Sequence, residues 1–143
     1  MTQPPILLGF DPGRDKCGIA VISPEQKILY HEVIAADAAI STVVTLSQQY
    51  AIETIVMGDR TTAKTWKPQL ETAVAQATII LVDEHYSSLQ ARDRYWQLFP
   101  PKGLMRLVPK GMRVPPRPID DIVAMILIER YQQQNHGEPP KPS

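Results

Sequence analysis

The sequence predicts an α/β domain built on a five-stranded mixed sheet, in which three antiparallel strands are followed by parallel strands and helices flank the sheet. Short apolar runs joined by turn-length connections open the chain, and later apolar runs alternate with segments of helical periodicity. A length of 143 residues suits one such domain. We expect it to comprise residues 1–131, followed by a disordered, proline-containing tail over residues 132–143.

The first three strands are predicted at residues 6–11, 18–22 and 27–33. The first is a short apolar run between Pro5 and an Asp-Pro-Gly turn, which is typical of a buried strand. The connection over residues 23–26 has the length and composition of a hairpin turn. These three strands are therefore expected to be antiparallel neighbours.

Helices and strands then alternate. Asp37 is expected to cap a helix with one apolar face, and residues 54–57 form a buried strand that ends at Gly58. A second helix, with apolar residues at helical spacing between positions 66 and 77, precedes a fifth strand at residues 78–82. The predicted order is three strands, helix, strand, helix, strand, helix.

The C-terminal part of the sequence contains signals for the start and the end of two further helices. Ser87 and Gln90 match a capping box, which predicts a helix to about Leu98. Six prolines between residues 100 and 118 predict an extended or turning loop. Residues 122–128 are all apolar, which is typical of a helix packed into the core.

Charge is balanced overall but not along the chain. The formal net charge is zero, which argues against a strongly basic coat for nucleic acid. Between Arg92 and Arg117, however, seven cations face one anion, Asp93. This segment is either a basic face or a solvated loop. The single Cys17 and the absence of a leader-like or long apolar run predict a cytoplasmic protein without a membrane partner.

Carboxylates occur at three points that the predicted sheet brings together. Asp11 ends the first strand, Glu84 follows the fifth, and Asp120 and Asp121 open the last helix. Parallel strands deliver their C-terminal ends to one edge, where ligands bind in such sheets. Grouped carboxylates require a neutralising cation, and oxygen ligands without His or Cys suit Mg²⁺ or Mn²⁺.

Each acid also has an ordinary structural interpretation. Asp11 begins a turn signal, Glu84 or its neighbour Asp83 suits the N-terminus of the next helix, and Asp120 is a natural N-cap. For each acid considered alone, the structural interpretation is preferred over a role in a functional site. The order of the acids along the chain favours a common site.

Three segments together resemble the RNase H-like superfamily, and within it the Holliday-junction-resolvase-like nucleases of the YqgF type. Residues 9–21 look like the family's opening motif, residues 82–92 like its Asp-Glu-Arg stretch, and residues 120–127 like its last helix. The resemblance spans roughly residues 5–131. His85 stands where the family usually has Arg.

The resemblance implies a Mg²⁺- or Mn²⁺-dependent endonuclease that hydrolyses phosphodiester bonds in structured nucleic acid, either a DNA junction or a structured RNA. Holliday junction resolution and pre-ribosomal RNA processing are the two activities it suggests, for a monomer or homodimer. It assigns catalysis and metal binding to Asp11, Glu84 and Asp120, with Asp121 as a fourth candidate.

Cations are then expected on the flanking phosphates. The candidates lie after the first strand, in the predicted third helix and in the proline-rich loop: Arg14, Lys16, Arg92, Arg106, Lys110 and Arg113.

Two other functions remain open. The first is a catalytically inactive module of the same fold that binds nucleic acid or a protein. The second is an actin-like ATPase or sugar kinase, whose first strand also presents an Asp before a glycine turn. Those proteins require two such domains, and 143 residues are too few for both.

Overall fold

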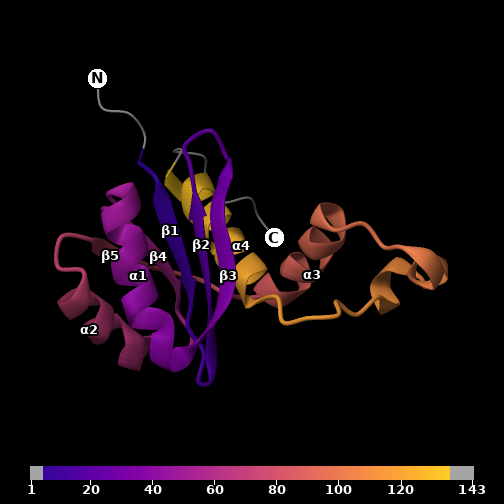
Figure 1. Ribbon diagram of the computed structural model, residues 1–143, viewed down its shortest axis with the longest axis horizontal. Helices are drawn as coiled ribbons and strands as arrows, with labels where there is room; N and C mark the ends of the chain where they lie inside the picture. Colours follow the sequence, from indigo (N-terminus) through magenta and orange to yellow (C-terminus); the bar gives the residue numbers. More distant parts are fainter. Residues whose placement is uncertain (1–4, 136–143) are drawn as a thin grey trace.

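The structure is a computed structural model that describes residues 5–135 (Figure 1). Its five strands form one sheet in the order β3-β2-β1-β4-β5. The strands are β1 (Leu7–Asp11), β2 (Lys16–Ile22), β3 (Ile28–Ala35), β4 (Thr54–Gly58) and β5 (Thr78–Val82).

The pairing confirms the predicted mixed sheet. Strand β2 is antiparallel to both β1 and β3, whereas β1, β4 and β5 run parallel. The parallel strands therefore end at one edge, where Asp11, Gly58 and Val82 are the last strand residues.

Helices cover both faces of the sheet. Helices α1 (Ala36–Tyr50) and α2 (Ala63–Ala73) pack on one face, around a core that includes Phe10 and Trp66. Helix α4 (Asp120–Asn135) covers the other face and packs against α3 (Ser87–Leu98). Figure 1 shows the resulting three layers, with α1 and α4 on opposite sides of the strands.

Helix α4 is the centre of the second core. Residues 122–128 are all buried, as the uninterrupted apolar run predicts. Complete burial of one such aliphatic side chain contributes about 1.5–3 kcal/mol. The helix continues to Asn135, so residues 132–135, assigned from the sequence to the tail, are helical. Nothing breaks the helix there, because the next glycine is Gly137. The rest of the predicted tail lies outside the described residues.

The helix starts differ from the sequence predictions. Asp37 lies in the first turn of α1, and Ala35 is the N-cap, so the predicted Asp cap is wrong. The predicted capping box is also wrong: α3 begins after Tyr86, whose φ of 61° is left-handed, and no side chain caps it. Within residues 5–135 the buried Ser87 hydroxyl has no hydrogen-bond partner.

Residues 100–118 form a projection that we call the arm. It contains two short 3₁₀ turns, Gly103–Leu107 and Lys110–Met112, joined by extended proline-containing backbone. Figure 1 shows the arm extending beyond α3, away from the sheet. The predicted turning loop is therefore confirmed, and it leaves the body of the domain.

In the part of the chain that the structure describes, none of the helices combines the length and apolar character needed to cross a bilayer.

Candidate functional site

Asp11 and Asp120 are brought together by the close packing of α4 on the sheet. Asp11 pairs with Gly18 of the neighbouring strand β2. The first turn of α4 lies directly on Gly18, because a Cβ atom there would overlap the backbone carbonyl of Asp120. Only glycine permits this approach. Asp120 therefore starts α4 beside the end of β1.

Glu84 approaches Asp11 from the other side of β1. Strand β4 ends at Gly58, and a Cβ atom on Gly58 would overlap the Glu84 carboxylate. The Glu84 amide donates to Asp59 Oδ1 at 3.3 Å. The turn that carries Glu84 thus folds back over the ends of the parallel strands, and the side chain is 2% exposed.

Helix α4 also contacts the turn that carries Glu84, through Arg130. The Arg130 guanidinium donates to the backbone carbonyls of Asp83 at 2.7 Å and of His85 at 2.6 Å. These two residues flank Glu84 in the sequence. Arg130 is therefore a positioning residue for Glu84 that the sequence reasoning did not identify.

The Asp11 and Glu84 carboxyls form a buried pair, and Asp11 is only 9% exposed. Burial raises the pKa of Asp11 to about 9, with further contributions from its hydrogen bond to Glu84 and from the negative charges of Glu84 and Asp120. Burial also raises the pKa of Glu84. In the absence of a cation the pair therefore retains a proton at neutral pH, with Asp11 donating toward Glu84.

Arg60 offsets part of this negative charge. Its Nε lies 2.7 Å from Glu84 Oε2, while the side chain is 61% exposed. The approach is an ion pair without the orientation of a good hydrogen bond. Apart from the proton shared with Asp11, the buried Glu84 oxygens therefore have no hydrogen-bond donor within residues 5–135. Arg60 was missed from the sequence, although it follows the C-terminal end of a parallel strand.

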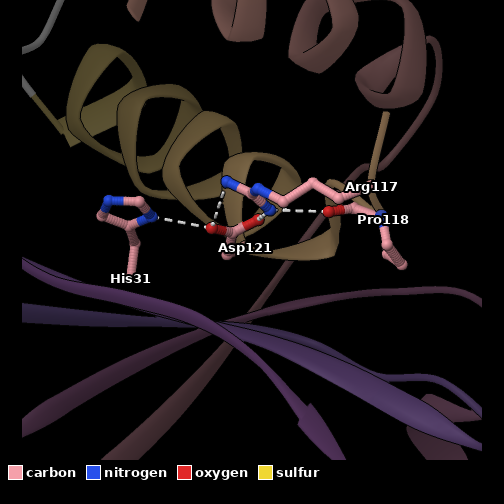
Figure 2. Close-up of polar contacts among 4 residues, drawn as sticks. All are labelled: His31, Arg117, Pro118 and Asp121. Carbon is pink, nitrogen blue, oxygen red and sulfur yellow. Dashed lines mark hydrogen bonds and ion pairs between the residues drawn. The ribbon is translucent and has the colours of Figure 1, made fainter. Parts of the chain in front are cut away.

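Asp121 has different neighbours from Asp120. It is 1% exposed and accepts two hydrogen bonds from Arg117, at 3.0 and 3.2 Å, and pairs with His31 Nδ1 at 2.7 Å (Figure 2). Burial alone would raise its pKa, but the hydrogen bonds from Arg117 and His31 hold the pKa of Asp121 below its ordinary value. Its carboxylate is therefore already neutralised, and it is not grouped with Asp11 and Glu84.

The donor set at the edge of the sheet suits a hard cation. Asp11, Glu84 and Asp120 provide only carboxylate oxygens, and within residues 5–135 the proton shared with Asp11 is the only hydrogen bond to the buried Glu84 oxygens. As they stand, no three His, Cys, Asp or Glu side chains among residues 5–135 are arranged to hold a metal ion. Binding a cation therefore requires the Asp11–Glu84 proton to leave and the side chains to adjust.

A basic cleft lies next to these acids. Its volume is about 490 Å³, and its lining includes Arg60, Lys64, Lys67 and the half-exposed Leu81. Lys64 and Lys67 belong to the first turns of α2. The sequence reasoning did not single out these two lysines, because their spacing on α2 resembles that of any solvated helix face.

The six predicted phosphate-contacting cations are distributed over three regions. Arg14 is exposed in the turn after Asp11 and Lys16 at the start of β2, Arg92 is half-buried on α3, and Arg106 and Lys110 are exposed on the arm. Arg113 differs, because its guanidinium donates to the carbonyls of Val108 at 2.9 Å and Arg106 at 3.4 Å. The Arg113 guanidinium is therefore engaged in hydrogen bonds within the arm.

Comparison with solved structures identifies the fold. RuvC from Thermus thermophilus superposes with a TM-score of 0.59 at 15% sequence identity, over 92% of this chain and 96% of RuvC. The chain therefore has the RNase H-like fold, as the sequence resemblance implies. A putative sugar kinase from Cytophaga hutchinsonii matches 64% of this chain and 39% of its own length at 11% identity, and its TM-score of 0.40 is too low to bear on function. No protein-family model and no curated protein matches the sequence.

Proposed function

On the RNase H-like fold that this chain shares with RuvC, we propose a metal-dependent endonuclease that hydrolyses phosphodiester bonds in structured nucleic acid. One observation carries the proposal: two buried carboxyls, Asp11 and Glu84, adjoin at the end of the central strand, and beyond their shared proton the Glu84 oxygens have no hydrogen-bond donor among residues 5–135. Burying acids in this way destabilises a fold, and acids with strongly raised pKa values occur mainly at functional sites.

Asp11, Glu84 and Asp120 would hold the Mg²⁺ or Mn²⁺. When bound, the ion supplies an activated water and stabilises the charge that develops on the leaving oxygen. The protein's own contribution is positional. Gly18 and Gly58 leave room for the acids beside Asp11. Asp121 acts as a structural partner of Arg117 under this proposal, and not as a fourth ligand.

The cations around the acids suit a phosphate backbone. Arg14 and Lys16 lie shortly after Asp11 in the sequence, and the basic cleft presents Lys64 and Lys67 beside Arg60. Phosphate contacts of this kind fix the position of a nucleic acid without reading its sequence. We propose that the scissile strand passes between these two groups of cations.

A binding module without cleavage is the second candidate. It is favoured by the proton that Asp11 and Glu84 retain and by the lack of a ready three-ligand arrangement among residues 5–135. The two candidates differ in whether a divalent ion displaces that proton.

Cleavage assays separate them. The purified chain is incubated with a four-way DNA junction, precursor ribosomal RNA and single-stranded controls, in Mg²⁺, Mn²⁺ or EDTA. We expect metal-dependent scission that is lost in Asp11→Asn and Glu84→Gln and retained in Asp15→Asn, because Asp15 is exposed in the adjacent turn. Binding without scission under all conditions would establish the module instead.

The same panel addresses the substrate and the assembly. Scission of the junction and not of the RNA would assign junction resolution, and the reverse would assign RNA processing. Symmetric junction cleavage requires two sites facing opposite strands, so we expect a homodimer on the junction if that substrate is cut. Light scattering of the free and junction-bound protein measures this.

A further inference from the structure

The arm exposes large apolar side chains that neither core covers. Leu104 is 82% exposed, Leu107 80%, Met112 71% and Val114 69%. They lie on a single segment that extends from the body of the domain (Figure 1). Exposed apolar residues grouped in this way mark an interaction site.

The arm is held in a defined shape despite its exposure. Arg113 bonds to the carbonyls of Val108 and Arg106, and Trp96 Nε1 of α3 donates to the Arg113 carbonyl at 3.4 Å. At the base, Arg117 is fixed to Asp121. Because the apolar residues are already held outward, a partner gains their contact area at a reduced entropic cost.

The charge of the arm identifies the chemistry of the partner. Residues 100–118 contain five cations and no Asp or Glu. Two of the cations are engaged within the domain, as described, and the other three are exposed: Lys102, Arg106 and Lys110. These alternate along the sequence with Leu104, Leu107 and Met112. A partner that offers anions and flat apolar surfaces at this spacing is a nucleic acid whose bases are accessible.

We propose that the arm inserts Leu104 and Leu107 between bases at a branch point or other unstacked step, while Lys102, Arg106 and Lys110 contact the neighbouring phosphates. Inserting an apolar side chain between bases costs unstacking free energy, and this cost is smallest where the bases are already unpaired. The inference rests on the proposed function for its nucleic-acid partner. It adds that the arm is the segment that recognises an unstacked step, through the side chains of Leu104 and Leu107.

Fluorescence of 2-aminopurine placed at the centre of a four-way junction tests the insertion. Binding is measured in EDTA, so that cleavage plays no part, and a continuous duplex with the same base serves for comparison. We expect the wild-type chain to raise the fluorescence of the junction. The double variant Leu104→Ser/Leu107→Ser should lose this rise and about tenfold or more of its junction affinity. Both side chains are highly exposed, so the fold should be retained.

Matched variants define the outcome. Leu89→Ser removes a side chain that is 56% exposed on α3, outside the arm, and should change nothing. Arg106→Gln/Lys110→Gln should weaken binding to junction and duplex alike. The inference is overturned if the Leu104/Leu107 variant keeps both fluorescence rise and affinity, or if it changes only the oligomeric state, which would make the arm a contact between copies of the chain.

The readouts also separate this inference from the proposed nuclease activity. Insertion without any metal-dependent scission upholds the arm's role and refutes the nuclease. Scission that is unaffected by the leucine substitutions, together with unchanged fluorescence, upholds the nuclease and refutes the role of the arm.

Discussion

Replacing Asp11 by asparagine is expected to stabilise the fold at neutral pH while removing the central acid of the site. Burial and the neighbouring Glu84 raise the pKa of Asp11 from 3.8 to about 9. The folded chain therefore keeps a proton that the unfolded chain releases once the pH exceeds about 4. It follows that the folded state loses stability as the pH rises through this interval.

The size of this penalty follows from the two pKa values. Each pH unit above the unfolded pKa costs about 1.4 kcal/mol, so the upper limit at pH 7 is on the order of 4 kcal/mol. Asparagine has no titration and its amide still donates to Glu84. Because the Asp11 and Glu84 carboxyls share their proton, we expect a gain of about 1–3 kcal/mol at pH 7.

Urea denaturation in EDTA at pH 4, 6, 7 and 8.5 measures the effect. The gain in Asp11→Asn should be near zero at pH 4 and increase with pH. Asp15→Asn, at an exposed site, should show no such trend. Adding Mg²⁺ should stabilise the wild type and not Asp11→Asn. A variant less stable than the wild type at every pH, or a gain that does not depend on pH, would refute the reasoning.

Three further results are expected. Asp121→Asn should lose about 1–3 kcal/mol of stability, because it removes a buried carboxylate that accepts hydrogen bonds from the part-exposed Arg117. The loss should fade as the pH falls below about 4, where a carboxylate with a depressed pKa ceases to stabilise the fold, and urea denaturation measures both effects. Gly58→Ala should displace the Glu84 carboxylate and so abolish both cleavage and stabilisation by Mg²⁺. The control Gly111→Ala, at a position with open space around it among the described residues, should leave cleavage and Mg²⁺ stabilisation unchanged. Lys110→Gln should reduce the slope of log affinity against log salt by about one, and an unchanged slope excludes a phosphate contact.

The sheet was predictable because local pattern determines it. Short apolar runs joined by a hairpin-length turn require antiparallel pairing over residues 6–33, and strands separated by helices require parallel pairing. The buried α4 followed from an apolar run too long for one face of a helix. The position of Asp11 followed as well, because it is the residue that ends the first strand.

The composition of the site was less predictable, because it depends on packing between distant segments. Successive residues on a helix point in different directions, so Asp120 and Asp121 cannot share one environment, and only the contact of α4 with Gly18 decides between them. Arg60 lies in a loop without periodicity. The internal bonds of Arg113 depend on two 3₁₀ turns that the proline spacing does not specify.

Arg117 has a consequence for how this molecule can diverge. Its guanidinium is bonded to Asp121 and lies 5.4 Å from the Tyr95 ring centre and 5.8 Å from that of Phe99, so one side chain ties the root of the projection to α3 and α4. Beyond this tie, the outer residues touch neither core. Their identity and number can therefore change without displacing the carboxyls, so the outer part of the arm and the group of acids can vary independently.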